Sequence, residues 1–148
     1  MAERRQGKGE AFADLTFEVA AMFFCMRAAG ERLGLVSKVG GTLGFMRTLA
    51  LEGPVTVPEL ARLRPTSRQR MQQLADELVE EGLIEFVDNP NHRKSKLMRL
   101  TRKGEARYRA MLKQLYEMGA AISSDVGEGD LRKAVALIRD LRKRIPAD

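Results

Sequence analysis

Apolar residues recur every three or four positions through most of this chain, as they do in helices with one buried side. The pattern predicts six helices, at about residues 12–33, 37–51, 56–64, 67–81, 102–123 and 131–145. Between the fourth and fifth helices, the stretches 83–87 and 96–100 are β-prone, and Asn89-Pro90-Asn91 marks a turn between them. The predicted fold class is therefore mainly α with a small β-hairpin.

The first and last predicted helices carry more apolar surface than one chain can cover. The seam of the first helix consists of Leu15, Val19, Met22, Met26, Ala29 and Leu33. The last helix has a stripe made of Leu131, Ala134, Val135, Ile138, Leu141 and Ile145. Phe17 and Phe24 extend the apolar surface of the first helix to its other sides, and such a helix must be covered all round. In a chain of 148 residues the simplest cover is a second copy, so we expect a homodimer.

Glycines shape the expectations for the two N-terminal segments. Residues 1–10 are expected to be a flexible tail, because Gly7 and Gly9 disfavour a helix there. Ser37 can cap the second helix, in which Gly40 and Gly44 share one face and would let a neighbouring helix approach closely. This segment is not a phosphate loop, because the Lys and Ser/Thr of that motif are missing.

Two short central helices have clear end signals. Thr56 and Glu59 have the spacing of a capping box, and Pro65 ends the first of these helices. Ser67 can cap the second, and Gly82 can end it. The predicted buried stripe of the second consists of Met71, Leu74, Ala75, Leu78 and Val79.

The exposed start of the helix after Ser67 is rich in the side chains that read base edges in DNA. Arginine pairs with guanine and glutamine with adenine. The predicted DNA-binding residues of this helix and the preceding turn are Thr66, Ser67, Arg68, Gln69, Arg70, Gln72 and Gln73. Two helices joined by a turn and followed by a hairpin form a winged helix-turn-helix, whose second helix enters the major groove.

Charge points to the same partner. The stretch 89–104 holds six basic residues and no acid, and removing these six from the 26 Lys and Arg leaves 20, equal to the 20 Asp and Glu. The whole formal excess of +6 therefore lies in this stretch, as expected for contact with a polyanion at a fixed place. The predicted DNA-binding residues of the hairpin are His92, Arg93, Lys94 and Lys96, along the backbone or in the minor groove.

In this order and spacing, three motifs resemble the MarR family of transcriptional regulators. They are Thr56-Val57-Pro58-Glu59-Leu60-Ala61, Leu78-Val79-Glu80-Glu81-Gly82-Leu83-Ile84, and the run from Asn89 to Thr101 followed by Gly104. The resemblance spans nearly the whole chain. It departs from the family in the hairpin, where His92 and Lys94 stand in place of an Asp and an Arg that brace the wing.

The resemblance implies an architecture and a function. A single domain over 11–148 would hold a winged helix-turn-helix at about 54–101 and a dimerisation platform of helices at about 11–33 and 102–146. The protein would bind double-stranded DNA as a homodimer at a pseudo-palindromic operator, as a repressor relieved by a small aromatic effector bound between the platform and the winged module.

The same residues argue against other classes of protein. One His and one Cys, far apart in the predicted fold, do not build a metal site or a Cys–His nucleophile pair, so we expect no enzyme, cofactor or metal. The longest uncharged apolar run is far shorter than the roughly 20 residues of a membrane span, and no signal peptide is visible, so we expect a cytoplasmic protein.

Two alternatives remain. The basic hairpin could meet an acidic protein instead of DNA, although the base-reading residue types argue against such an interaction module. Cys25 could make the protein a redox-sensing regulator, but it lies on the side of its helix expected to be buried, with Arg27 as its one basic neighbour. We therefore expect Cys25 to be a small buried apolar residue.

Overall fold

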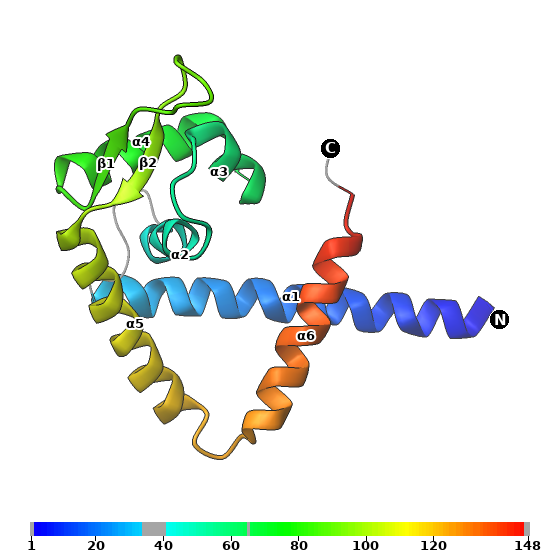
Figure 1. Ribbon diagram of the computed structural model, residues 1–148. Coiled ribbons are helices and arrows are strands. Elements are labelled where there is room, and N and C mark those ends of the chain that lie inside the picture. The colour runs from blue at the N-terminus through cyan, green and yellow to red at the C-terminus, as the bar shows by residue number, and fades with distance from the viewer. Residues whose placement is uncertain (1, 34–40, 65, 147–148) are drawn as a thin grey trace. The chain divides into compact units, whose positions relative to one another are not determined.

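A computed structural model describes residues 2–33, 41–64 and 66–146 (Figure 1). The helices are α1 (Ala2–Arg32), α2 (Thr42–Glu52), α3 (Val57–Leu63), α4 (Arg68–Glu80), α5 (Arg102–Ile122) and α6 (Glu128–Arg144), and the strands are β1 (Ile84–Val87) and β2 (Leu97–Leu100). The mainly helical fold with one small hairpin is confirmed. The chain divides into two compact units, Met1–Met111 and Leu112–Asp148.

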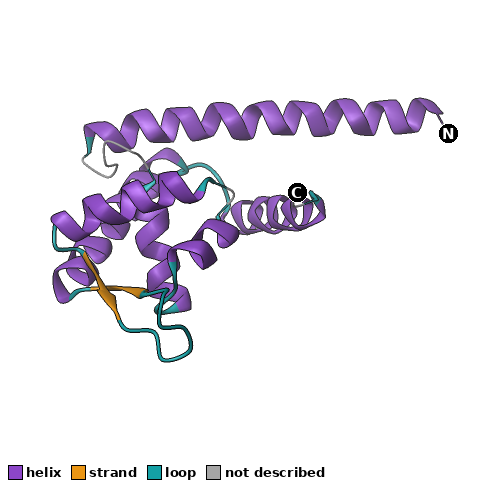
Figure 2. Cartoon of the chain, turned by 90° about the horizontal axis from the view of Figure 1, so that it is seen from above, coloured by secondary structure: helices purple, strands orange, loops and turns teal. Residues whose placement is uncertain are grey.

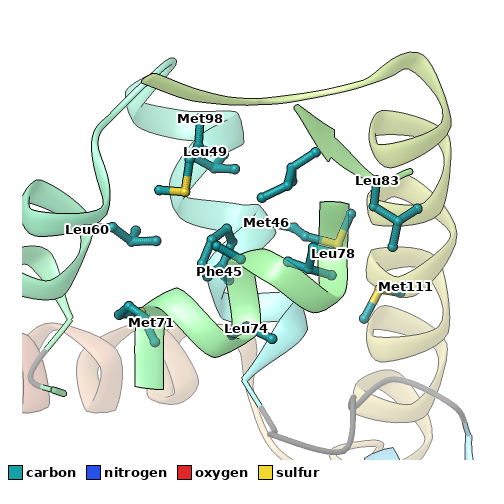
Figure 3. Close-up of a cluster of buried hydrophobic side chains, with 12 residues drawn as sticks. Phe45, Met46, Leu49, Leu60, Met71, Leu74, Leu78, Leu83, Met98 and Met111 are labelled. Carbon is teal, nitrogen blue, oxygen red and sulfur yellow. The ribbon is translucent and has the colours of Figure 1, made fainter. Parts of the chain in front are cut away.

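The hydrophobic core of the first unit is built where α2, α3, α4, the hairpin and the first half of α5 meet (Figure 3). Its fully buried large side chains are Phe45, Met46, Leu60, Leu74, Leu78, Ile84, Met98 and Met111. Each comes from the apolar face of its own helix or strand, so one cluster fixes the orientation of α4 and of the hairpin together. Burial of a side chain of this size stabilises the fold by about 1.5–3 kcal/mol.

The hairpin is a two-stranded antiparallel sheet (Figure 2, orange). Its register pairs Ile84 with Leu100 and Val87 with Leu97. Val55 forms an isolated bridge to Met98 through two main-chain hydrogen bonds of 2.8 and 3.2 Å. The segment before α3 is thereby tied to the second strand of the hairpin.

The residues predicted to cap α3 and α4 make the expected hydrogen bonds. The Thr56 hydroxyl accepts from the Glu59 main-chain N–H at 3.3 Å, and the Glu59 carboxylate accepts from the Thr56 main-chain N–H at 2.7 Å, which completes the capping box. The Ser67 hydroxyl accepts from the main-chain N–H of Arg70 at 3.2 Å. Gly82 follows α4 with φ of 71°, in the left-handed region that glycine tolerates.

Hydrogen bonds and close packing fix the connection from the hairpin into α5. The Thr101 hydroxyl donates to the Gly82 carbonyl oxygen at 2.7 Å and accepts from the Gly104 main-chain N–H at 3.0 Å. The Lys103 ammonium donates to the Glu81 carbonyl oxygen at 2.6 Å, at the carboxyl end of α4. Gly104 packs directly on the Leu83 carbonyl group and leaves no room for a side chain.

Two expectations about the N-terminal segments differ from the structure. Instead of a flexible tail over 1–10, α1 begins at Ala2 and runs through Gly7 and Gly9. Each glycine costs a helix about 1 kcal/mol relative to alanine, which weakens the helix without breaking it. Ser37 and Gly40 lie outside the described residues, and α2 begins after Gly41. Gly44 faces the guanidinium of Arg64, so the expected contact between helix backbones is wrong for this glycine.

Several large apolar residues are exposed in the single chain, among them Val79, which was expected in the buried stripe of α4. In the first unit Leu51, Leu63 and Val79 lie outside the cluster, with exposed fractions of 62%, 54% and 39%. Each sits at the margin of its helix's apolar face, and in helices this short the margin is not covered. Cys25 is also exposed, contrary to expectation, because the described residues leave that side of α1 uncovered.

The second unit consists of the end of α5, the turn through Gly127, and α6. On α6 no side chain is buried, and exposed ion pairs one turn apart line its polar side, among them Arg132 with Glu128 and Lys133 with Asp130. None of the described helices is long and apolar enough to cross a membrane.

Candidate nucleic-acid interface

Helix α4 presents the predicted base-reading side chains. Its apolar stripe, Met71, Leu74, Ala75 and Leu78, is buried in the core. The stripe therefore fixes the rotation of the helix about its axis, and the opposite side faces out. Ser67, Arg68, Gln69, Arg70, Gln72 and Gln73 are all exposed there, and Thr66 is half-buried in the turn before the helix.

Charge changes sign along α4. Its first turn contains Arg68 and Arg70 and no acidic residue. Its second half carries Asp76, Glu77 and Glu80. The main-chain N–H groups at the start of the helix add partial positive charge to the basic turn. The amino-terminal half of α4 is therefore the half suited to approach a phosphate backbone.

The loop between β1 and β2 holds the basic cluster and projects from the first unit (Figure 1). The Asn89 side-chain oxygen accepts from the Asn91 main-chain N–H at 3.0 Å, and the Asn89 carbonyl oxygen accepts from the His92 N–H at 3.2 Å. These turns give the loop its shape. The side chains of His92, Arg93, Lys94 and Lys96 are exposed.

The hairpin has an ion pair that the sequence did not reveal. The Arg99 side chain donates from Nε to Glu85 Oε1 at 2.8 Å, across the two strands. These residues are direct partners in the strand register, so the pair follows from the pairing itself. Both side chains are about half exposed, so the pair contributes roughly 0–1 kcal/mol. It crosses the hairpin near its base, next to the Ile84–Leu100 pair.

Two charged groups near the interface have perturbed acidity. Main-chain and side-chain hydrogen bonds from Thr56 hold the pKa of Glu59 below its ordinary value. Burial lowers the pKa of Arg64, because its guanidinium is largely withdrawn from water where it lies over Gly44. The Arg64 guanidinium thus lies against α2.

A second contact missed in the sequence lies within α4. The Gln72 side chain donates from Nε2 to Asp76 Oδ1 at 2.8 Å. The two residues are four apart on one helix, a spacing that brings side chains together and that could have revealed the contact.

A hollow of about 360 Å³ lies within the first unit. It is lined by Leu49, Ala50, Gly53, Pro54, Arg99, Leu100, Glu105, Tyr108 and Arg109. Its lining includes two arginines, Arg99 and Arg109, and one acid, Glu105. No group of three or more potential metal ligands occurs among the residues that the structure describes.

Comparison with known proteins identifies the architecture. The sequence model of the MarR family matches residues 42–95, which include α2, α3, α4 and β1. An uncharacterized protein of Mycobacterium tuberculosis is 30% identical over 131 residues, which cover 87% of this chain and 85% of the relative.

Solved structures agree with the sequence comparisons. A crystal structure of a MarR family transcription regulator matches with a TM-score of 0.73 and 26% identity, covering 94% of this chain and 97% of that one. A mutant MarR of E. coli, solved with operator DNA, matches with a TM-score of 0.60 and 19% identity, covering 72% of this chain and 74% of that one. The chain therefore belongs to the MarR family of transcriptional regulators, and its first unit contains that family's winged helix-turn-helix.

Proposed function

We propose that this regulator binds a specific DNA operator through α4 and the β1–β2 loop, and represses transcription by occupying the promoter. The observation that carries the proposal is the pairing of two surfaces on one unit. One is the exposed start of α4 with its Arg and Gln side chains, and the other is the basic loop. A single hydrophobic core holds both.

The two surfaces suit different parts of DNA. Glutamine and arginine on an exposed helix match the donor and acceptor pattern of the major groove. Lysine and arginine on a projecting loop match phosphates or the narrow minor groove, where they add affinity with little sequence choice. An acidic protein partner would make use of the basic loop but not of the glutamines.

We propose further that the operator is pseudo-palindromic and that the protein binds it as a homodimer. Large apolar side chains on α1 and α6 support a second copy, because they are exposed in the single chain. Two winged units related by a two-fold axis would read two half-sites about one helical turn of DNA, or a multiple of it, apart.

The hollow in the first unit is a candidate place for a small aromatic effector. Leu49, Leu100 and Tyr108 offer an apolar surface, and the Arg99 and Arg109 side chains offer charge for an acidic group. Arg99 is also the partner of Glu85 across the hairpin, so a ligand that engages Arg99 would act on the wing.

Nuclease footprinting on the DNA flanking the protein's own gene tests the proposed function. We expect two protected half-sites of related sequence, and we expect the protection to persist in an excess of random duplex, because random DNA lacks the base contacts of the operator. Uniform protection of all DNA, or none at low salt, would contradict the proposal. Recovery of an acidic protein without DNA binding would favour the interaction module.

A further inference from the structure

The glutamines on the exposed side of α4 are not equivalent. The Gln72 carboxamide is held by Asp76, one turn further along the helix, through a hydrogen bond of 2.8 Å from Nε2 to Oδ1. Among the described residues, Gln69 and Gln73 have no such partner. Of the three exposed glutamines, Gln72 is therefore the one whose amide is already oriented before DNA arrives.

The direction of this bond determines what Gln72 offers to a base. Asp76 uses one of the two amide N–H groups, so the amide oxygen Oε1 is turned away from the carboxylate, and Oε1 remains available as an acceptor with the second N–H beside it. A free glutamine can rotate its amide to turn either its oxygen or its N–H groups toward a base, whereas the bond to Asp76 holds the Gln72 oxygen in one direction. The pair formed by Gln72 and Asp76 favours bases that donate.

Only two bases donate a hydrogen bond in the major groove, adenine through N6 and cytosine through N4. Guanine presents N7 and O6, and thymine presents O4, all of them acceptors. We propose that Asp76 is a positioning residue for sequence reading: by holding the Gln72 amide, it makes Gln72 select adenine or cytosine on the strand it contacts. This inference rests on the proposed role of α4 as the reading helix.

The Asp76 carboxylate has a second effect, which the test must separate from the first. A negative charge on α4 repels phosphates whatever the base sequence, so its removal should tighten binding to all DNA. Glu80 is an exposed acid on the same helix, one turn beyond Asp76, and among the described residues no hydrogen bond joins it to Gln72. Glu80→Ala is therefore a matched control that removes the same charge and leaves the Gln72 hydrogen bond in place.

The experiment uses the full-length protein and a library of random duplex DNA. Wild type first selects a consensus, and competition between single base-pair variants then measures the preference at each position. For Gln72→Ala we expect loss of the preference for adenine or cytosine at one position in each half-site. For Asp76→Ala we expect the preference there to fall about twofold to fivefold, the scale of a charge-assisted contact between side chains four apart. Glu80→Ala should tighten binding while leaving every base preference unchanged.

A double variant decides whether Asp76 acts through Gln72. In the Gln72→Ala background, Asp76→Ala should change no base preference, because the side chain that Asp76 positions is gone. A change of preference in that background would mean that Asp76 reads a base itself, which would overturn the inference. So would an Asp76→Ala protein with the wild-type preference.

The inference and the proposed function fail in different ways. If Gln73→Ala alters base preference but Asp76→Ala does not, α4 reads DNA and only the role of Asp76 is wrong. If neither Gln72→Ala nor Gln73→Ala alters any preference, α4 is not the reading helix and both proposals fall.

Discussion

At the scale of single residues, two enclosed glycines of the winged unit differ in what a side chain would meet. A Cβ at Gly104 would collide with the main-chain carbonyl of Leu83, which the hairpin and the start of α5 hold in place. A Cβ at Gly44 would collide with the guanidinium of Arg64, the far end of a flexible side chain. The main chain at Leu83 cannot easily shift to make room, whereas the Arg64 side chain can.

Gly104→Ala and Gly44→Ala should therefore differ in their effect on stability. We expect Gly104→Ala to lower the free energy of unfolding by about 1–3 kcal/mol or more, as overpacking does. Gly44→Ala should be neutral or stabilising, because the helix gains up to about 1 kcal/mol and Arg64 can turn to water, which hydrates its charge better. Urea unfolding followed by circular dichroism measures both. Equal losses in the two variants would contradict this reading.

Substitutions of Lys96 and Gln73 should have different effects on overall DNA affinity and on sequence specificity. Lys96→Ala should weaken binding to operator and random DNA alike and lower the salt slope by roughly one unit. Gln73→Ala should cost about 1–3 kcal/mol on the operator and much less on random DNA. Salt titrations on both DNAs measure these effects.

Lys103→Ala is the matched control for the lysine in this experiment. It removes the same charge from the same basic stretch, but the Lys103 ammonium already donates to the Glu81 carbonyl oxygen at the end of α4. We expect its loss to affect stability and to leave the salt slope near that of wild type. An unchanged ratio of operator to random affinity in Gln73→Ala would remove α4 from the reading role.

At the scale of elements, local signals predicted the caps and missed what depends on tertiary contact. The Thr56–Glu59 box and the Ser67 cap involve residues three apart, so the sequence contains both partners. Glu85 and Arg99 are fourteen residues apart and meet only once the hairpin register is known. The sequence predicts that the first helix begins near residue 12, whereas α1 begins at Ala2. Gly7 and Gly9 lower the helix propensity of this segment, but they do not determine where the helix begins.

The capping box of α3 should make stability depend on pH. Hydrogen bonds from Thr56 lower the folded-state pKa of Glu59 below its unfolded value. The resulting stabilisation is complete above the unfolded pKa and is lost as pH falls through the folded pKa. We expect Glu59→Gln to reduce stability at neutral pH and to unfold with a weaker dependence on acid than wild type. Thermal melts between neutral and strongly acidic pH measure this, with Glu52→Gln at the end of α2 as control.

At the scale of the whole molecule, the sequence could predict that the apolar surfaces of α1 and α6 need to be buried against a partner. It could not predict how that partner is oriented. Large side chains such as Phe17, Met22 and Phe23 on α1 are each more than 60% exposed in the single chain. On α6, Val135 and Ile138 are 52% and 40% exposed. A repeating stripe shows which side of a helix needs a partner, whereas the partner's position depends on a surface that the stripe does not contain.

A charged pair of substitutions on α6 tests whether a second copy covers that stripe. Val135→Glu with Ile138→Glu should give a monomer, because burying two unpaired carboxylates in an interface is strongly unfavourable. The winged core lies in the other unit and should remain folded. Operator affinity should then fall by orders of magnitude toward that for random DNA, since a single winged unit reads only one half-site.

Sedimentation and operator binding measured on the same preparations check this prediction. Ala136→Glu adds one carboxylate to α6 next to the stripe and should remain dimeric if the stripe alone forms the interface. Removal of all residues after Gly129 is the more drastic version, and should give insoluble protein or protein inert toward DNA. A soluble monomer that binds the operator as tightly as wild type would show that reading DNA does not require a second copy, and the two-fold operator would fall with it.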